Sequence, residues 1–182
     1  FTNGTIPTER IVRAVNSLLP PDIVLLEASE ADREFSARHS ARSKTYLYRV
    51  QQGEVPDPFT RQYAWYVRRR LDLAAMQTAM DGILGIHDFS SFRAAGGAPV
   101  SPVRTMYEAS CVEKANGMLE FRFFGSGFLY HMVRNLVGTL VNVGLGRITP
   151  EHFQEILAAK DRQQASATAP PQGLYLCRVD YD

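Results

Sequence analysis

The segment from Gly125 to Arg147 restricts the fold of this chain most, because a glycine turn leads directly into a long apolar helix. At about 100° per residue, large apolar side chains cover well over half of the helix circumference, so we expect a mostly buried helix. One permanent cation, Arg134, lies at the edge of this apolar arc and must be paired or reach water along its stem. Helix geometry alone leaves two interpretations open. The arginine extends its head into solvent, or it is aimed at an anionic group in a cleft.

Shorter helices and strands are predicted over the rest of the chain. Helix signals, an N-cap residue before apolar residues at helical spacing, begin at Thr8, Asp72 and Thr149. Strand signals are alternating or apolar runs over residues 23–28, 44–51, 62–68, 105–114, 118–124 and a last run after Gly173. Asn116-Gly117 predicts a two-residue hairpin turn. Because hairpins dominate, we expect an α+β fold in which helices pack on a mainly antiparallel sheet.

Composition excludes some classes of protein and leaves others open. The 182 residues are 45% hydrophobic and 21% charged, which is typical of a globular chain. A formal net charge of +1 does not indicate a nucleic-acid binder, so any RNA affinity must come from a local basic surface. Cys111 and Cys177 are isolated and the four histidines are scattered, so no metal site is expected. The two cysteines fit a reducing cytoplasm, although a single disulfide stays open.

The start of the chain suggests a piece of a longer protein. It reads Phe1-Thr2-Asn3-Gly4, with no initiator methionine and no basic leader, so we expect no signal peptide and a chain cut inside a larger gene product. A domain boundary is expected near residues 38–45. Residues 1–42 would be the tail of an N-terminal domain, and residues 43–182 a C-terminal RNA-modifying domain.

Several blocks of the sequence, in order, resemble one enzyme family. Residues 127–140 are similar to the FxxxMVRxxVGT helix of the TruA family of tRNA pseudouridine synthases. Further similar blocks are residues 35–41, 44–48, 87–93, 104–105, 158–162 and 168–176. The resemblance implies a pseudouridine-synthase fold and isomerisation of uridine in the anticodon arm of tRNA. It also implies a cytoplasmic homodimer that needs no metal or organic cofactor.

The same resemblance implies a catalytic pair. The reaction breaks the N-glycosidic bond of uridine, turns the base and reattaches it through carbon. The family uses a carboxylate nucleophile, an arginine that holds it ionised and an aromatic ring stacked on the base. Arg134 matches the arginine, which stays charged and pairs bidentately with a carboxylate. Tyr46, within Lys44-Thr45-Tyr46, matches the ring. The competing interpretation makes Tyr46 and Tyr48 ordinary core residues of an alternating strand.

Substrate-binding residues are also implied. Leu174 is expected against the other face of the base, although an apolar residue at a strand start is often part of the core. Arg38, Arg42 and Lys44 lead into the Tyr46 strand and are expected to contact phosphates beside the site. A second basic run, residues 68–70, precedes a helix cap and is interpreted as a solvated turn.

The family's nucleophile lies in a Gly-Arg-Thr-Asp-Ala-Gly block that has no counterpart here. The aspartates present occupy caps, turns and strand ends: Asp22, Asp32, Asp57, Asp72, Asp81, Asp88, Asp161, Asp180 and Asp182. The chain therefore resembles the C-terminal two-thirds of such an enzyme, and we expect it to be inactive alone. Two other functions stay open: an RNA-binding module without chemistry, and an oligomerisation fragment.

Overall fold

A computed structural model describes residues 6–181 and divides the chain into two compact units, one up to Ser40 and one from Ala41 on. The first unit contains one helix, α1 (Thr8–Asn16), followed by irregular backbone. Pro7 is its N-cap residue, so the prediction that Thr8 caps the helix is wrong. The domain division at residue 42 stays a prediction.

The strand predicted over residues 23–28 is also wrong, because this segment has no regular secondary structure. Its backbone is tied to the helix instead: the Asn16 side-chain amide accepts a hydrogen bond from the Leu25 N–H and donates one to the Leu25 carbonyl. Leu26 is 87% exposed. An apolar run forms a strand only where a neighbouring strand satisfies its backbone groups, and no strand pairs with it within residues 6–40.

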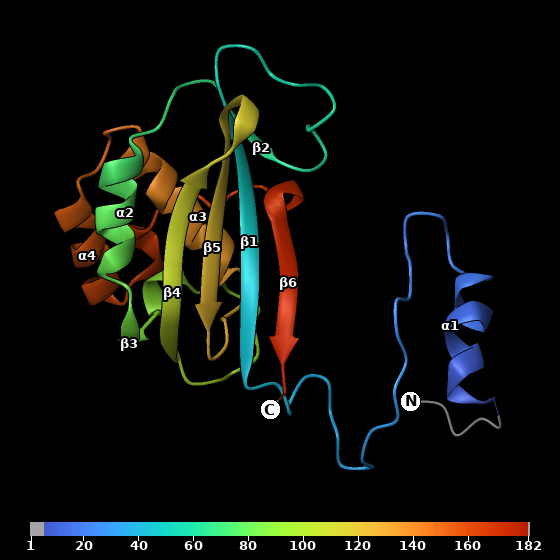
Figure 1. Cartoon of the computed structure of the whole chain (residues 1–182). Helices are drawn as coiled ribbons and strands as arrows, with labels where there is room; N and C mark the ends of the chain where they lie inside the picture. The colour runs from blue at the N-terminus through green and yellow to red at the C-terminus, as the bar shows by residue number, and fades with distance from the viewer. Residues whose placement is uncertain (1–5, 182) are drawn as a thin grey trace. The chain divides into compact units, whose positions relative to one another are not determined.

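The second unit is built on a six-stranded sheet in the order β2-β1-β5-β4-β3, with β6 also paired to β1 (Figure 1). The strands are β1 (Ser43–Gln52), β2 (Trp65–Val67), β3 (Gly85–Asp88), β4 (Val103–Glu113), β5 (Met118–Gly125) and β6 (Leu174–Asp180). All pairings are antiparallel except that of β1 with β2. The predicted α+β fold with a mainly antiparallel sheet is confirmed.

Two differences from the expected strands have clear causes. The turn between β4 and β5 spans residues 115–117 rather than two residues, and both Asn116 and Gly117 adopt positive φ. The sequence therefore predicted the position of this turn and its two left-handed residues, but not its length of three residues. The short strand β3 was not predicted, because it has four residues and its Ile86 is 72% exposed.

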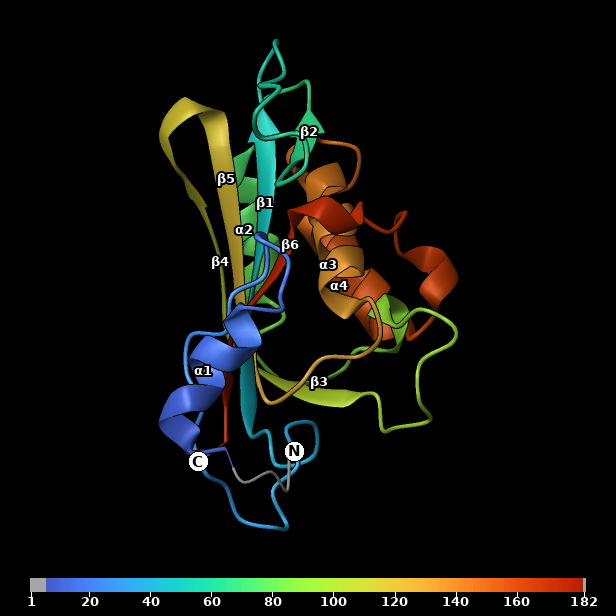
Figure 2. The same ribbon diagram turned by 90° about the vertical axis from the view of Figure 1, so that its right-hand side faces the viewer.

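Three helices cover the sheet: α2 (Leu73–Asp81), α3 (Met132–Gly144) and α4 (Pro150–Ala159). Figure 2 shows α3 and α4 on one face of the sheet, and α2 packs against α3, α4 and β4. Asp72 and Thr149 cap α2 and α4 as predicted, each accepting a hydrogen bond from a backbone N–H of the first turn. No helix within residues 6–181 combines the length and apolar character needed to cross a membrane.

The core of the second unit lies between the sheet and α3. Fully buried aromatic and aliphatic residues of both elements fill it: Tyr48, Val50, Phe121, Phe123, Leu136 and Leu140. On the other sheet face Arg49 pairs with Glu120 at 2.9 Å and lies over the Tyr175 ring. This one-sided burial fixes the strand register, because a slip of one residue would turn the core side chains outward.

Candidate active site

Arg134 lies in the first turn of the buried helix α3, directly after a backbone reversal. The reversal is at His131, which adopts a left-handed conformation (φ 57°) and starts the helix. The Arg134 Nε donates a 2.7 Å hydrogen bond to the Ala169 carbonyl, and its Nη1 lies 3.3 Å from the His131 Nε2. The backbone completes this link, because the Ala169 N–H donates to the Arg134 carbonyl. The guanidinium is therefore held against the protein rather than extended freely into solvent.

Half of the guanidinium remains available for a further partner. Arg134 is half-buried, and within residues 41–181 no carboxylate lies within 4 Å of it. Its Nη2 makes no hydrogen bond in the same part of the chain. Burial, together with the nearby Arg134 charge, lowers the pKa of His131, so this imidazole is neutral at pH 7. The Arg134–His131 pair therefore carries a single positive charge, which suits it to binding one anion.

Asn135 fixes the segment that holds Arg134, a role that the sequence analysis did not assign. Its fully buried side chain donates to the Phe92 carbonyl at 2.7 Å and accepts from Thr168 Oγ1 at 2.6 Å and Arg162 Nη2 at 3.1 Å. An amide inside an apolar helix is itself a signal, because a buried polar group requires partners. Here the partners come from two segments far along the chain, which no local pattern reveals.

Tyr46 and Tyr48, two residues apart on β1, differ in environment. Tyr48 is fully buried, and its hydroxyl donates a 2.6 Å hydrogen bond to the Pro170 carbonyl. Tyr46 is only half-buried; its ring packs edge-to-face on Phe128 with centroids 5.0 Å apart. Burial raises the pKa of Tyr46, so its hydroxyl stays protonated at neutral pH. The core-residue interpretation therefore describes Tyr48, whereas Tyr46 keeps an exposed surface.

The segment of residues 168–174 contacts both Arg134 and Tyr48. Ala169 binds Arg134, the following Pro170 binds Tyr48, and Leu174 is the register partner of Tyr48 across the β1–β6 pair. Burial raises the pKa of Tyr48 while the Arg134 charge lowers it, in agreement with the proximity of the two side chains. Tyr46 follows about 7 Å along the same strand. Arg134, Leu174 and Tyr46 thus lie around Tyr48, and Leu174 is half-buried against the core.

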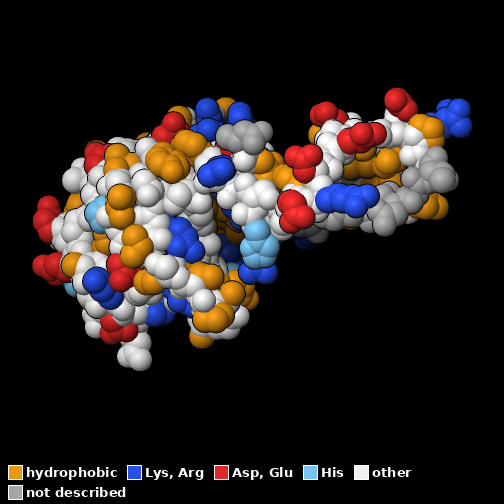
Figure 3. All heavy atoms as spheres, turned by 90° about the horizontal axis from the view of Figure 1, so that it is seen from below, with side chains coloured by type: hydrophobic (Ala, Val, Ile, Leu, Met, Phe, Trp, Pro, Cys, Tyr) orange, Lys and Arg blue, Asp and Glu red, His pale blue; other side chains and the backbone are white. Residues whose placement is uncertain are grey.

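The predicted phosphate-binding residues are only partly brought together. Arg42 and Lys44 lie at the start of β1, the end that carries Tyr46, and the Arg42 backbone N–H donates to the Asp180 carbonyl. Neither side chain forms a salt bridge or a hydrogen bond within residues 41–181. Figure 3 shows basic side chains around a hollow on the larger unit, viewed from this end. Arg38 is exposed and belongs to the first unit.

The site combines a fixed arginine, a half-exposed tyrosine ring and unpaired basic side chains beside a mixed sheet. The mainly antiparallel α+β fold places the second unit in the class of pseudouridine-synthase-like domains. A family model described as tRNA pseudouridine synthase matches residues 79–182. The chain belongs to this tRNA pseudouridine synthase family, so the resemblance stated from the sequence is confirmed.

Curated relatives are similar over nearly the whole chain. The tRNA pseudouridine synthase A of Lacticaseibacillus casei (strain BL23) is 47% identical over 179 residues, which cover 98% of this chain and 72% of the relative. The protein of that name from Exiguobacterium sp. is 46% identical over 181 residues, covering 100% and 72%. The one from Bacillus subtilis (strain 168) is 47% identical over 178 residues, covering 98% and 72%.

Proposed function

We propose that this chain is the larger part of an enzyme that converts uridine to pseudouridine in the anticodon arm of tRNA. The observation that carries the proposal is Arg134: a half-buried arginine held by the Ala169 carbonyl, with no carboxylate partner in its own unit. Such a group can bind and orient an aspartate. The names of the relatives support tRNA as the substrate, and the family resemblance supports the anticodon arm.

The proposed reaction is an isomerisation that needs no oxidant or reductant. The C1′–N1 bond of uridine breaks, the base turns, and a C1′–C5 bond forms while C5 loses its hydrogen to solvent and N1 gains a proton. Arg134 pairs with the nucleophilic aspartate and keeps it ionised. The Tyr46 ring stacks on the base, its hydroxyl remaining protonated, and Leu174 limits the other face of the base. Arg42 and Lys44 bind phosphates beside the site. Arg38, a residue of the first unit, is proposed as a further phosphate-binding residue.

The aspartate in this proposal comes from a Gly-Arg-Thr-Asp-Ala-Gly block, which these 182 residues do not contain. We therefore propose that the chain alone is inactive and that a segment bearing the block completes the site. A cytoplasmic homodimer is proposed on the family resemblance. Cys111 and Cys177 are both free thiols, which agrees with the reducing cytoplasm of this proposal.

Tritium release from tRNA labelled at C5 of uracil tests the proposal. The 182-residue chain, purified from a host that lacks its own enzyme, should release none. A chimera that places the Asp-bearing segment of the Bacillus subtilis relative before Phe1 should release tritium, and changing that aspartate to asparagine should abolish the release. Release by the chain alone would refute the assignment of the nucleophile. A folded chimera that binds tRNA without releasing tritium would favour the RNA-binding module instead.

A further inference from the structure

Arg68, Arg69 and Arg70 form an open basic pocket of about 560 Å³ together with Gly53 and Glu54. We propose that this pocket, here called the arginine pocket, binds the phosphate backbone of the RNA substrate at a second point away from Tyr46. The inference rests on the proposed function for the identity of the RNA. It replaces the earlier interpretation of residues 68–70 as a solvated turn.

The three arginines are unpartnered. All three are exposed, and none forms a salt bridge or hydrogen bond within residues 6–181. Glu54 is the one carboxylate among the residues that line the pocket. Three adjacent like charges repel one another, so they do not serve the stability of the free protein. A polyanion would relieve this repulsion.

The position of the run adds to the positive potential. The run ends at Arg70, two residues before Asp72, the N-cap residue of α2, where the helix dipole places partial positive charge. Cations at a helix N-terminus are unfavourable for the helix itself. A bound phosphate would be favoured by both the arginines and the dipole.

The backbone that carries the arginines is fixed at both ends. Before the run, the Gly53 N–H donates to the Val67 carbonyl. After it, the Leu71 N–H donates at 2.8 Å to the buried Gln52 side chain, and the Asp72 N–H donates to the Gly144 carbonyl. A run anchored in this way presents its side chains from a rigid base, which reduces the entropy lost on binding.

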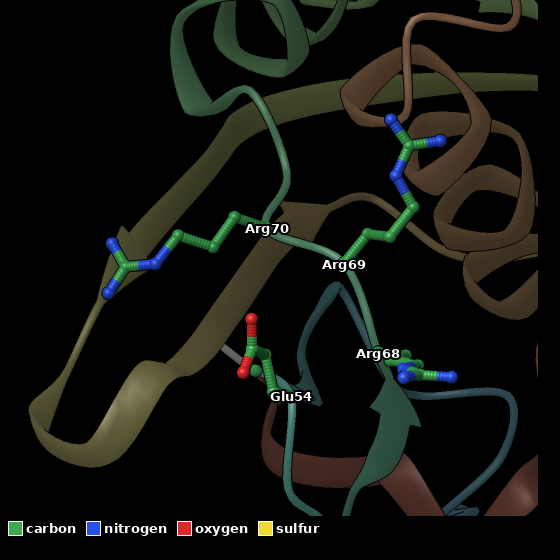
Figure 4. Close-up of a pocket in the computed structure, with 5 residues that line it drawn as sticks. Glu54, Arg68, Arg69 and Arg70 are labelled. Atoms are coloured by element: carbon green, nitrogen blue, oxygen red, sulfur yellow. The ribbon is translucent and has the colours of Figure 1, made fainter.

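The directions of the side chains indicate the kind of anion. Figure 4 shows the three guanidinium groups pointing apart, with Glu54 between Arg70 and Arg68, on the side away from the Arg69 guanidinium. A single phosphate or nucleotide would require convergent donors, whereas successive phosphates of a nucleic-acid backbone suit divergent ones. Gln52, the register partner of Val67, lies six residues from Tyr46 along β1, or roughly 20 Å. The pocket therefore binds RNA outside the target nucleotide.

Salt dependence of tRNA binding tests this directly. The 182-residue chain and a variant with all three of Arg68–Arg70 changed to glutamine are titrated with an unmodified tRNA transcript at several salt concentrations. Each lost phosphate contact lowers the slope of log affinity against log salt by about one. We expect the slope to fall by about two to three, and the affinity at 0.1 M salt to fall about 10-fold or more.

Two controls make the result specific. Changing Arg68–Arg70 to lysine keeps the charges and should keep nearly the wild-type slope, and its fold serves as the reference for the glutamine variant. A second variant removes charges elsewhere on the unit, at Arg122 and Lys160, and should leave the slope within about half a unit. Equal losses in the glutamine variant and this control, an unchanged slope, or no tRNA binding by the wild-type chain would each overturn the inference.

The outcome is separable from that of the proposed function. In the active chimera, the glutamine variant should raise KM for tRNA and leave the rate at saturating tRNA within about twofold, because the arginines are remote from the reacting base. If the glutamine variant changes the slope but the chimera is inactive, the arginine pocket is supported and the proposed reaction is refuted. If the slope is unchanged and the chimera is fully active, the proposed reaction is supported and the arginine pocket is refuted.

Discussion

Replacing Arg134 by methionine separates two effects that the structure assigns to this one side chain. Methionine keeps most of the stem volume but removes the hydrogen bond to the Ala169 carbonyl, which belongs to a residue only 1% exposed. Hydrogen bonds to charged groups contribute about 1.5–3 kcal/mol, and an unsatisfied buried carbonyl adds a comparable penalty. Because part of the guanidinium is solvated, we expect the free energy of unfolding to fall by about 2 kcal/mol.

The effect on catalysis should be larger than this loss of stability explains. In the chimera with the Asp-bearing segment, the same substitution leaves the nucleophile unpaired. Loss of a charge-assisted bidentate pair at a reacting group should slow tritium release by roughly 10²-fold or more, on the scale of about 3 kcal/mol. Urea denaturation measures the first effect, and single-turnover tritium release well below the unfolding transition measures the second.

Arg162 offers the matched control. Its guanidinium is bonded to the Ala165 carbonyl, the Asn135 amide and the Thr168 hydroxyl, so Arg162→Met should destabilise the protein by a similar amount. Its effect on the rate should remain below about 10-fold, because it acts on the reaction only through the segment that holds Arg134. Near-wild-type turnover of Arg134→Met, or equal rate losses in the two variants, would refute the reasoning.

Three further outcomes are expected. Tyr46→Phe should keep tRNA affinity while slowing the reaction, whereas Tyr46→Ala should weaken both by roughly 1–3 kcal/mol; unfolding without a selective loss of activity would favour a core role. Asn135→Ala should lower the free energy of unfolding by about 3 kcal/mol, measured in urea, because the fully buried amide loses three hydrogen bonds and leaves the buried Phe92 carbonyl without a partner; a loss below 1 kcal/mol would contradict this. Gly138→Ala should cost about 1–3 kcal/mol in a thermal melt, because its Cβ would meet the Ala167 carbonyl oxygen at 2.1 Å, and an unchanged melting temperature would show that the segment moves freely.

Local signals in the sequence were sufficient for much of the fold and insufficient for the site. The caps at Asp72 and Thr149 and the alternation along β1 act within a few residues, so the elements they predict are present. The strand predicted over residues 23–28 failed because its existence depended on a partner elsewhere. The role of Ala169 was also unpredictable, because alanine carries no functional group and its contact with Arg134 spans 35 residues of sequence.

The segment from Pro170 to Leu174 contacts Tyr48 at both of its ends. The Pro170 carbonyl binds the hydroxyl of Tyr48, Leu174 pairs with the backbone of the same residue, and only Pro171–Gly173 lie between. A Cβ at Gly173 would meet the Tyr48 ring at 2.8 Å. Homologues can vary the length of most surface loops, but an insertion or deletion here would shift either the carbonyl or the strand register. The spacing from Ala169 to Leu174 should therefore be invariant in every active relative, even where the residues themselves differ.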